Sequence, residues 1–199
     1  MGLLFVVLVL SVYAAKDMYA TTPYSTDNNI FYAAPLQNCL MYHRFMSNGN
    51  YYYVKFQNTD PKVTYYSDEL CEKTVGALEA PDTWTIQELD LDTYTTITTP
   101  AGSGVTLVFS SKCGKVTDTT SLDTKVESSQ LTLRMYNNAE CKLDDNDKAY
   151  YSQKFTCQDK NVFKTSSNQN MTGEPYRARI TCGASLFFSV LSALLFFLF

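Results

Sequence analysis

Apolar and polar residues alternate along several short segments of the chain, as they do in strands with one buried face. In QLTLRMY, residues 130–136, Leu or Met occupies every second position, and this spacing is the period of a half-buried strand. Further segments are rich in Tyr, Thr, Val and Phe, the residues that favour strands. They are 51–57, 62–67, 93–99, 104–110 and 149–157.

Turn-forming residues separate these segments, for example NTDPK at 58–62 and PAGSG at 100–104. Gly, Pro, Asn and Asp favour tight turns, and no segment between the two apolar ends keeps a helical period. The pattern therefore predicts an all-β fold, an antiparallel β-sandwich-like domain. Residues 15–38 are polar and turn-prone and are predicted as a lead-in, so that the extracellular β-rich domain spans residues 39–183.

The two ends of the chain are apolar. Residues 3–12 form an apolar run too short to cross a bilayer and are followed by small residues, as in a secretory signal peptide, so residues 1–14 are expected to form a signal helix that is removed. Residues 184–199 are predicted as an apolar helix. No charge follows Arg179, and a retained span needs Lys or Arg on its cytosolic side. A GPI-attachment signal is therefore favoured over a retained membrane span.

Six cysteines in a chain with an export signal predict disulfides. The six are Cys39, Cys71, Cys113, Cys141, Cys157 and Cys182. Their spacing does not fit a zinc site, which needs closer pairs. Six cysteines allow fifteen pairings, and sequence alone does not choose among them. The working hypothesis is sequential pairing, Cys39 with Cys71, Cys113 with Cys141 and Cys157 with Cys182, in which the disulfides close β-hairpins. Lipid attachment at Gly183 keeps every cysteine in the mature protein, whereas attachment near Thr172 would delete Cys182.

This layout of signal peptide, Tyr- and Thr-rich strands, paired cysteines and a GPI-like end resembles small GPI-anchored, disulfide-bonded surface proteins of protists. The resemblance covers the layout of the chain and no specific motif. It implies a location on the extracellular face of the plasma membrane, with the C-terminal anchor in the membrane. Asn170, the acceptor of an Asn-Met-Thr sequence, is the predicted glycosylation site.

Two internal likenesses stand out. YYYVKFQNTDPKV (51–63) and YYSQKFTCQDKNV (150–162) share Tyr, Tyr, Lys, Phe, Asp and Val at the same offsets. They suggest a recurring hairpin that turns at Asp60 and at Asp159. A weaker likeness links YYSDELC (65–71) and MYNNAEC (135–141), each with Tyr five residues before Cys. These segments are interpreted as two related ends of such hairpins.

Residues able to perform catalysis are sparse. His43 is the one histidine, and no nucleophile motif accompanies it, so the chain is not expected to be an enzyme. Glu88, Asp90 and Asp92 would share one face of a strand, and such carboxylates can hold calcium or serve a hydrolase. These three carboxylates also fit an ordinary solvated strand edge, and this interpretation is favoured over calcium binding and hydrolysis. Nucleic acid is not expected as a partner, because the net charge is −4 and no basic patch is visible. No cofactor is expected either.

Tyrosine is the enriched binding-capable residue, with fifteen copies. Tyr51 and Tyr53 share a strand face opposite Tyr52 and are candidate ligand contacts, since exposed tyrosines anchor glycans and proteins. Packing in the core or across strands is the alternative, and it is favoured both for these tyrosines and for the lone Trp84. The sequence thus predicts an anchored surface module for recognition or adhesion, with a glycan or protein ligand. A passive coat protein and a secreted hydrolase are the alternatives.

Overall fold

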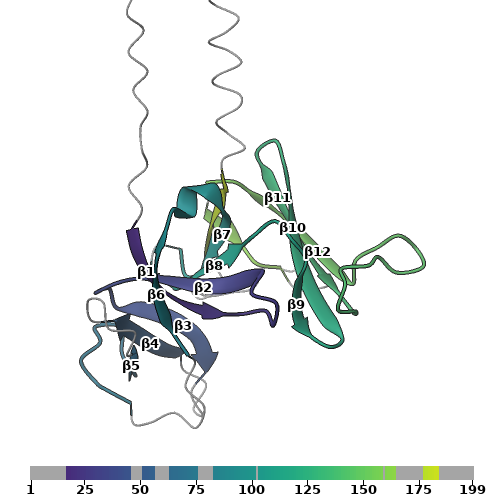
Figure 1. Cartoon of the computed structure of the whole chain (residues 1–199). Helices are drawn as coiled ribbons and strands as arrows, with labels where there is room; N and C mark the ends of the chain where they lie inside the picture. The colour runs from purple at the N-terminus through teal and green to yellow at the C-terminus, as the bar shows by residue number, and fades with distance from the viewer. Residues whose placement is uncertain are drawn as a thin grey trace, which may run out of the picture.

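A seven-stranded antiparallel sheet runs through the molecule and connects two smaller sheets (Figure 1). The computed structural model describes residues 17–45, 51–56, 63–75, 83–101, 103–158, 160–164 and 177–183. The strands are β1 (Asp17–Pro23), β2 (Ile30–Pro35), β3 (Leu40–Phe45), β4 (Tyr51–Phe56), β5 (Val63–Tyr66), β6 (Thr85–Leu89), β7 (Thr95–Thr98), β8 (Thr106–Phe109), β9 (Gly114–Thr117), β10 (Thr120–Glu127), β11 (Gln130–Tyr136), β12 (Tyr151–Thr156), β13 (Lys160–Val162) and β14 (Arg177–Cys182). One 3-10 helix, η1, covers Leu91–Thr93.

The large sheet has the order β13-β14-β7-β8-β2-β1-β6, and the small sheets have the orders β3-β4-β5 and β12-β11-β10-β9. Every pairing between named strands is antiparallel. The prediction of an all-β, antiparallel, sandwich-like fold is confirmed, and each predicted strand segment contains an observed strand.

Both small sheets pack on the same face of the large sheet. Ile30 and Ala34 lie four residues apart on β2 and therefore point to one side. Ile30 belongs to a buried cluster with Leu131 and Phe155 of the four-stranded sheet. Ala34 belongs to a second buried cluster with Phe56 of the three-stranded sheet. Hence β2 contributes residues to two hydrophobic cores.

The strand order is symmetric about the β2–β8 pair, because β1 and β6 follow on one side and β7 and β14 follow on the other. We call residues 17–89 the first unit and residues 95–183 the second unit. In each unit, a hairpin in the large sheet leads into three consecutive antiparallel strands of a small sheet. The second unit then adds β12 and β13 before β14.

The first two disulfides enclose equivalent parts of the two units. Cys39–Cys71 spans 32 residues around β3 to β5, and Cys113–Cys141 spans 28 residues around β9 to β11. Cys157–Cys182, with a separation of 25 residues, belongs to the second unit alone. All six predicted cysteines are bonded, and the sequential pairing is confirmed.

The loops that contain Cys71 and Cys141, the second cysteines of the first two disulfides, have the same backbone conformation and the same type of side-chain hydrogen bond. Cys71 and Cys141 both have positive φ, 53° and 51°. Three residues before Cys71, an Asp68 carboxylate oxygen accepts the backbone N–H of Glu72 at 2.9 Å. Three residues before Cys141, Oδ1 of Asn138 accepts the N–H of Lys142 at 3.0 Å. Side chains of Asp and Asn satisfy tight turns in this way.

Backbone hydrogen bonds tie each unit to the other. In the β1–β2 connection, the N–H of Thr26 donates to the carbonyl of Lys115 on β9 at 2.8 Å. In the β7–β8 connection, the carbonyl of Ser103 accepts from the N–H of Met41 on β3 at 2.9 Å. The hairpin of each unit therefore reaches the small sheet of the other, and the units share one continuous structure.

Three expectations need correction. The predicted lead-in, residues 15–38, instead supplies β1 and β2 in the interior of the large sheet. Three of its fully buried residues, Ala20, Ala33 and Ala34, carry a short side chain and give little apolar signal, although Ile30 is fully buried as well. The predicted second hairpin is also wrong, since β12 pairs with β11 and β13 pairs with β14 in another sheet.

The third correction concerns residues 88–92, which were expected to form one strand. Strand β6 ends at Leu89, and η1 follows. Asp90 starts that turn, because its Oδ1 accepts the backbone N–H of Asp92 at 3.2 Å. The signal helix (1–14), the apolar helix (184–199) and Asn170 lie outside the described residues. Within them, no helix has the length and apolarity needed to cross a membrane.

Candidate functional site: an aromatic groove in the second unit

A groove of about 430 Å³ opens at one end of the four-stranded sheet. Side chains from β10, β11, β12, the residue before β12 and the segment after β13 line it, and one of them is charged. The lining residues are Leu122, Leu133, Met135, Tyr150, Tyr151, Phe163 and Lys164. An apolar concavity with few polar groups is the usual form of a binding site.

The floor of the groove continues the hydrophobic core of the second unit. Leu133, Met135 and Phe163 pack against the buried cluster that contains Leu122. The ring of Phe163 meets the buried ring of Phe155 edge to face, with centroids 5.2 Å apart. The floor is therefore a packed surface that is formed before any ligand arrives.

The segment after β13 is held beside β12 by side-chain hydrogen bonds in place of a strand ladder. The buried Gln153 amide donates from Nε2 to the carbonyl of Val162 at 2.9 Å. Its Oε1 accepts the N–H of Lys164 at 2.9 Å. The Tyr151 hydroxyl donates to the carbonyl of Lys164 at 2.7 Å. These bonds fix Phe163 and Lys164 as one wall of the groove.

Tyr150 forms the exposed rim. Its side chain is 69% exposed, and among the described large hydrophobic residues only Leu70, at 68%, is similarly exposed. An exposed aromatic ring gains free energy when a partner covers it, and it loses little side-chain entropy on binding. The rim therefore supplies apolar contact area that the free protein leaves in water.

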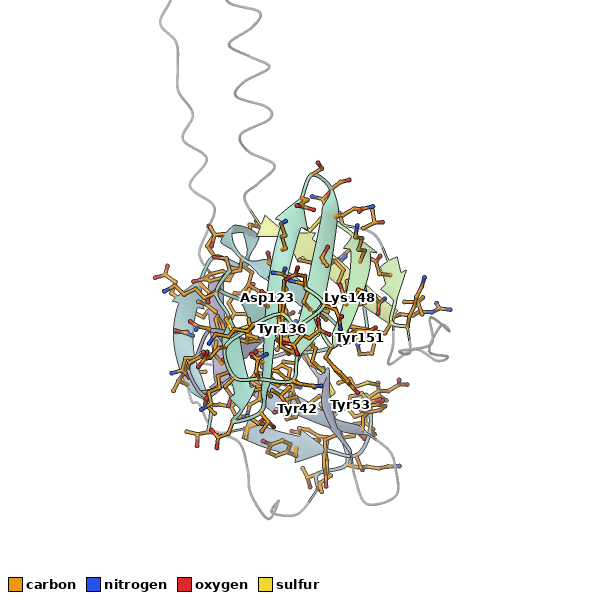
Figure 2. All side chains as sticks on the ribbon, turned by 90° about the vertical axis from the view of Figure 1, so that its right-hand side faces the viewer. Tyr42, Tyr53, Asp123, Tyr136, Lys148 and Tyr151 are labelled. Atoms are coloured by element: carbon orange, nitrogen blue, oxygen red, sulfur yellow. A yellow bond between two sulfur atoms is a disulfide. The ribbon has the colours of Figure 1, made fainter. Side chains whose placement is uncertain are left out.

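The opposite face of the same sheet carries a polar brace. Arg134 on β11 forms a bidentate ion pair with its cross-strand neighbour Asp123 on β10, at 2.7 Å for both bonds. The Tyr136 hydroxyl donates to the same carboxylate at 3.2 Å, and Figure 2 shows Asp123 and Tyr136 close together. Burial and the Asp123 charge raise the pKa of Tyr136 to about 12. This brace stiffens the strands that support the groove.

The predicted ligand contacts Tyr51 and Tyr53 lie elsewhere. They are half-buried on the three-stranded sheet, on the face opposite Tyr52, and Tyr52 packs against the buried cluster of the first unit. Burial raises the pKa of Tyr53, and the charges of Glu69 and Asp68 raise it further. Tyr53 is thus partly covered near the Cys71 loop, and the structure does not join it to the groove.

The other predicted residues do not come together as a site. The described residues contain no group of three or more His, Cys, Asp and Glu side chains arranged for a metal. Gly183 follows β14 with φ +62°, and a Cβ at this position would come within 3.2 Å of the backbone of Thr93 and Tyr94. Trp84 is 4% exposed, in agreement with a core position. Within the described part of the chain, its Nε1–H has no hydrogen-bond acceptor.

Sequence reasoning missed the groove because its residues are scattered. Tyr150 and Tyr151 stood in a predicted strand, but the pattern does not show that one ring is exposed while the other reaches Lys164. Phe163 and Lys164 follow the predicted hairpin, and their position depends on Gln153. The sequence held one signal for this site: Tyr150 and Tyr151 lie close to Cys157, whose disulfide with Cys182 has no counterpart in the first unit.

Comparison with known proteins adds no functional assignment: no family model matches the chain, and neither the curated proteins nor the solved structures include a significant match.

Proposed function

We propose that the protein is a recognition module on the extracellular face of the plasma membrane, anchored through its C-terminal segment, and that it binds a protein ligand in the aromatic groove. The observation that carries the proposal is the exposed Tyr150 ring at the rim of an apolar groove. Burial of exposed aromatic rings dominates the energetics of many protein interfaces.

The chemistry of the lining indicates the kind of ligand. Six of the seven lining residues are apolar or aromatic, and Lys164 is the one charged member. A protein segment that presents an apolar side chain next to a carboxylate complements both properties. A neutral polar ligand would gain less, because the aliphatic floor offers it no hydrogen bonds.

The position of the groove agrees with an anchored orientation. Asp17 pairs with Leu89, and Cys182 pairs with Thr95, so the described chain begins and ends at the edge where η1 joins β6 to β7. Cys157, which is bonded to Cys182 at the end of β14, follows the Gln130–Thr156 pair. The Met135–Tyr151 pair of the groove lies five residues further along the same strands. At the usual strand rise this is about 17 Å. A membrane at the chain ends therefore leaves the groove accessible.

Three disulfides support an oxidising location, because such bonds persist in secreted and surface proteins. The groove also lies where the second unit departs from the first, since β12, β13 and the third disulfide have no counterpart there. We interpret this addition as the part of the fold that carries the specific contact.

The test uses cells that express the full chain on their surface, probed with a panel of bead-bound extracellular proteins. We expect at least one protein to bind, and Tyr150→Ser to reduce that binding at least tenfold. Leu70→Ser is the matched control, because Leu70 is equally exposed but belongs to the first unit. A panel without binders would favour a passive coat protein and would contradict recognition.

The anchor is tested separately. Treatment of the same cells with a phosphatidylinositol-specific phospholipase is expected to release the protein into the medium. If the protein stays on cells from which a known GPI-anchored control is released, the retained span replaces the lipid anchor.

A further inference from the structure

A second concavity lies on the other face of the large sheet, away from both small sheets. Its volume is about 510 Å³, and it spans β1, β2, β6 and the connections around them. The lining residues are Thr21, Thr22, Pro23, Asn28, Phe31, Thr83, Thr85, Gln87, Leu89 and Tyr94. This set contains no Asp, Glu, Lys, Arg or His, which distinguishes it from the groove with Lys164.

The strand register explains why these side chains gather. Thr21 on β1 is paired with Thr85 on β6, and Pro23 is paired with Phe31 on β2. Directly paired residues point to the same face of an antiparallel sheet. Phe31 alternates with Ile30, which enters the core of the second unit. The concavity is therefore formed by the face that the core does not use.

A hydrogen-bond network orders the polar part of this lining. The Thr21 and Thr85 hydroxyls lie 3.1 Å apart, and the Nε2 of Gln87 donates to the Thr21 hydroxyl at 2.8 Å. Thr21 is 4% exposed, whereas Thr85 and Gln87 are exposed. The Gln87 amide is thus held in one orientation while its Oε1 stays available to a ligand.

Further polar groups at the concavity have no protein partner among the described residues. They are the side-chain amide of Asn28 and the hydroxyl of Thr83, and both residues are exposed. A side-chain amide offers a donor and an acceptor side by side. This arrangement matches a pair of adjacent hydroxyl groups, each of which can accept one hydrogen bond and donate another.

Two aromatic rings complete the lining. Phe31 and Tyr94 are half-buried and meet edge to face, with centroids 6.1 Å apart and an interplanar angle of 83°. The face of an aromatic ring carries partial negative charge and attracts polarised C–H groups. A saccharide presents such C–H groups on one side of its ring and hydroxyls around its edge.

From this combination we propose that the concavity is a binding site for a neutral saccharide, with the Gln87 and Asn28 amides on its hydroxyls and the Phe31 and Tyr94 rings against its apolar side. The site is separate from the protein-binding groove and does not rest on it. A recognition module with both sites would hold a glycan and a protein at once.

The charges nearby favour a neutral sugar over an acidic one. Tyr19 shares the face and pairs with Gln87. Its pKa is raised by burial and by the negative charges of Asp17, Asp92 and Asp90. These carboxylates give the adjoining edge of the sheet a negative potential, which repels sialic acid and sulfated sugars.

The experiment measures binding of fluorescent polymers to cells that express the full chain. The neutral probes carry glucose, galactose, mannose or N-acetylglucosamine, and the acidic probes carry sialic acid or sulfated galactose. We expect at least one neutral probe to bind and the acidic probes to bind more weakly. Gln87→Leu is expected to weaken that binding about tenfold, by removing hydrogen bonds to the sugar.

Controls separate this site from folding and from the groove. Gln130→Leu makes the same change at an exposed glutamine of another sheet and is expected to leave sugar binding unchanged. Asn28→Gly keeps the left-handed backbone at φ 58° while removing the amide and is expected to weaken binding. Tyr150→Ser is expected to have no effect, because it changes only the groove.

Several outcomes would overturn the proposal. They are no neutral probe bound above untransfected cells, equal loss in Gln87→Leu and Gln130→Leu, or unchanged binding in both Gln87→Leu and Asn28→Gly. Binding of a peptide panel that is lost in Gln87→Leu, without binding of any sugar, would assign the concavity to a protein ligand. Surface staining of each variant confirms that folded protein is present at equal density.

Discussion

Removal of the Asp123 carboxylate should destabilise the second unit more than any ordinary surface substitution. Its side chain is 16% exposed and that of Arg134 is 29% exposed. Asp123→Ala leaves the hydroxyl of Tyr136, a residue 2% exposed, without its acceptor. A buried donor that loses its partner costs about 1–3 kcal/mol. Arg134 keeps access to water, so its loss is that of a cross-strand pair, about 1 kcal/mol.

The expected destabilisation is therefore about 2–4 kcal/mol. In a protein of this size 1 kcal/mol changes Tm by about 2–4 °C, so Tm should fall by roughly 10 °C. Thermal unfolding followed by near-ultraviolet circular dichroism measures the change. Tyr136→Phe should cost less, because the ion pair remains. The two substitutions together should cost less than the sum of their separate effects.

Asp118→Ala is the matched control, since Asp118 pairs with Lys115 at 2.7 Å but its side chain is 94% exposed. Exposed ion pairs contribute little, and no measurable change in Tm is expected. A loss of less than about 1 kcal/mol in Asp123→Ala, or strict additivity with Tyr136→Phe, would refute the idea that one buried acceptor serves both groups.

Three further predictions concern the rest of the fold. Replacing Cys113 and Cys141 by Ser should lower the free energy of unfolding by about 3–4 kcal/mol on the loop-entropy account, measured by urea titration; a loss below about 1 kcal/mol would contradict it. Asp68→Ala and Asn138→Ala should each lower the free energy of unfolding by about 1 kcal/mol, because each removes the side-chain acceptor of backbone N–H groups in its cysteine loop. No loss in either variant would mean that these side chains do not support the loops. Burial is the largest single influence on Asp27 and opposes its ionisation, but hydrogen bonds from the Ser25 hydroxyl, the N–H of Lys115 and Asn29 together outweigh it and lower its pKa from the usual 3.8. Because the pKa of Asp27 is lower in the folded state, its ionised form stabilises the fold above about pH 4, and this contribution is lost as pH falls through the pKa of the folded state. The free energy of unfolding of Asp27→Asn should therefore depend less on pH in the acid range. A pH profile identical to that of the unaltered protein would contradict this role of Asp27.

The sequence was a good guide to strands that have one buried face. The alternation in 130–136 identified β11, and the Tyr-rich segments identified β4 and β12. It missed β1 and β2, because the buried residues of β1 (Ala20, Thr21 and Thr22) and two of the three in β2 (Ala33 and Ala34) carry little apolar signal. Ala20 and Ala34 lie in a buried cluster with the large rings of Phe56 and Trp84, and the sequence does not display this tertiary packing.

The two internal likenesses show how local similarity can mislead. The stronger match, 51–63 with 150–162, joins segments whose pairings differ, because β4–β5 is a hairpin and β12–β13 is not. The weaker match joins Tyr66 with Tyr136 and Cys71 with Cys141, and these residues hold equivalent places in the two units. Disulfides and positive-φ turns constrain particular positions, whereas a run of tyrosines reflects strand composition.

The candidate site could be predicted only in part. The sequence indicated tyrosines as ligand contacts and proposed Tyr51 and Tyr53, which lie on the three-stranded sheet, whereas the groove is lined by Tyr150 and Tyr151. The groove depends on Gln153 linking β12 to Val162 and Lys164, a tertiary contact with no local pattern. The saccharide site depends on the register of β1 with β6, which connects residues 64 positions apart.

The most direct test of recognition is binding of the bead-bound protein panel to cells that express the full chain, its Tyr150→Ser variant or its Leu70→Ser variant at equal surface density. We expect a ligand whose binding falls at least tenfold in Tyr150→Ser and is unchanged in Leu70→Ser. Equal binding by all three chains, or no binding to any of them, would contradict the assignment of the groove as the ligand site.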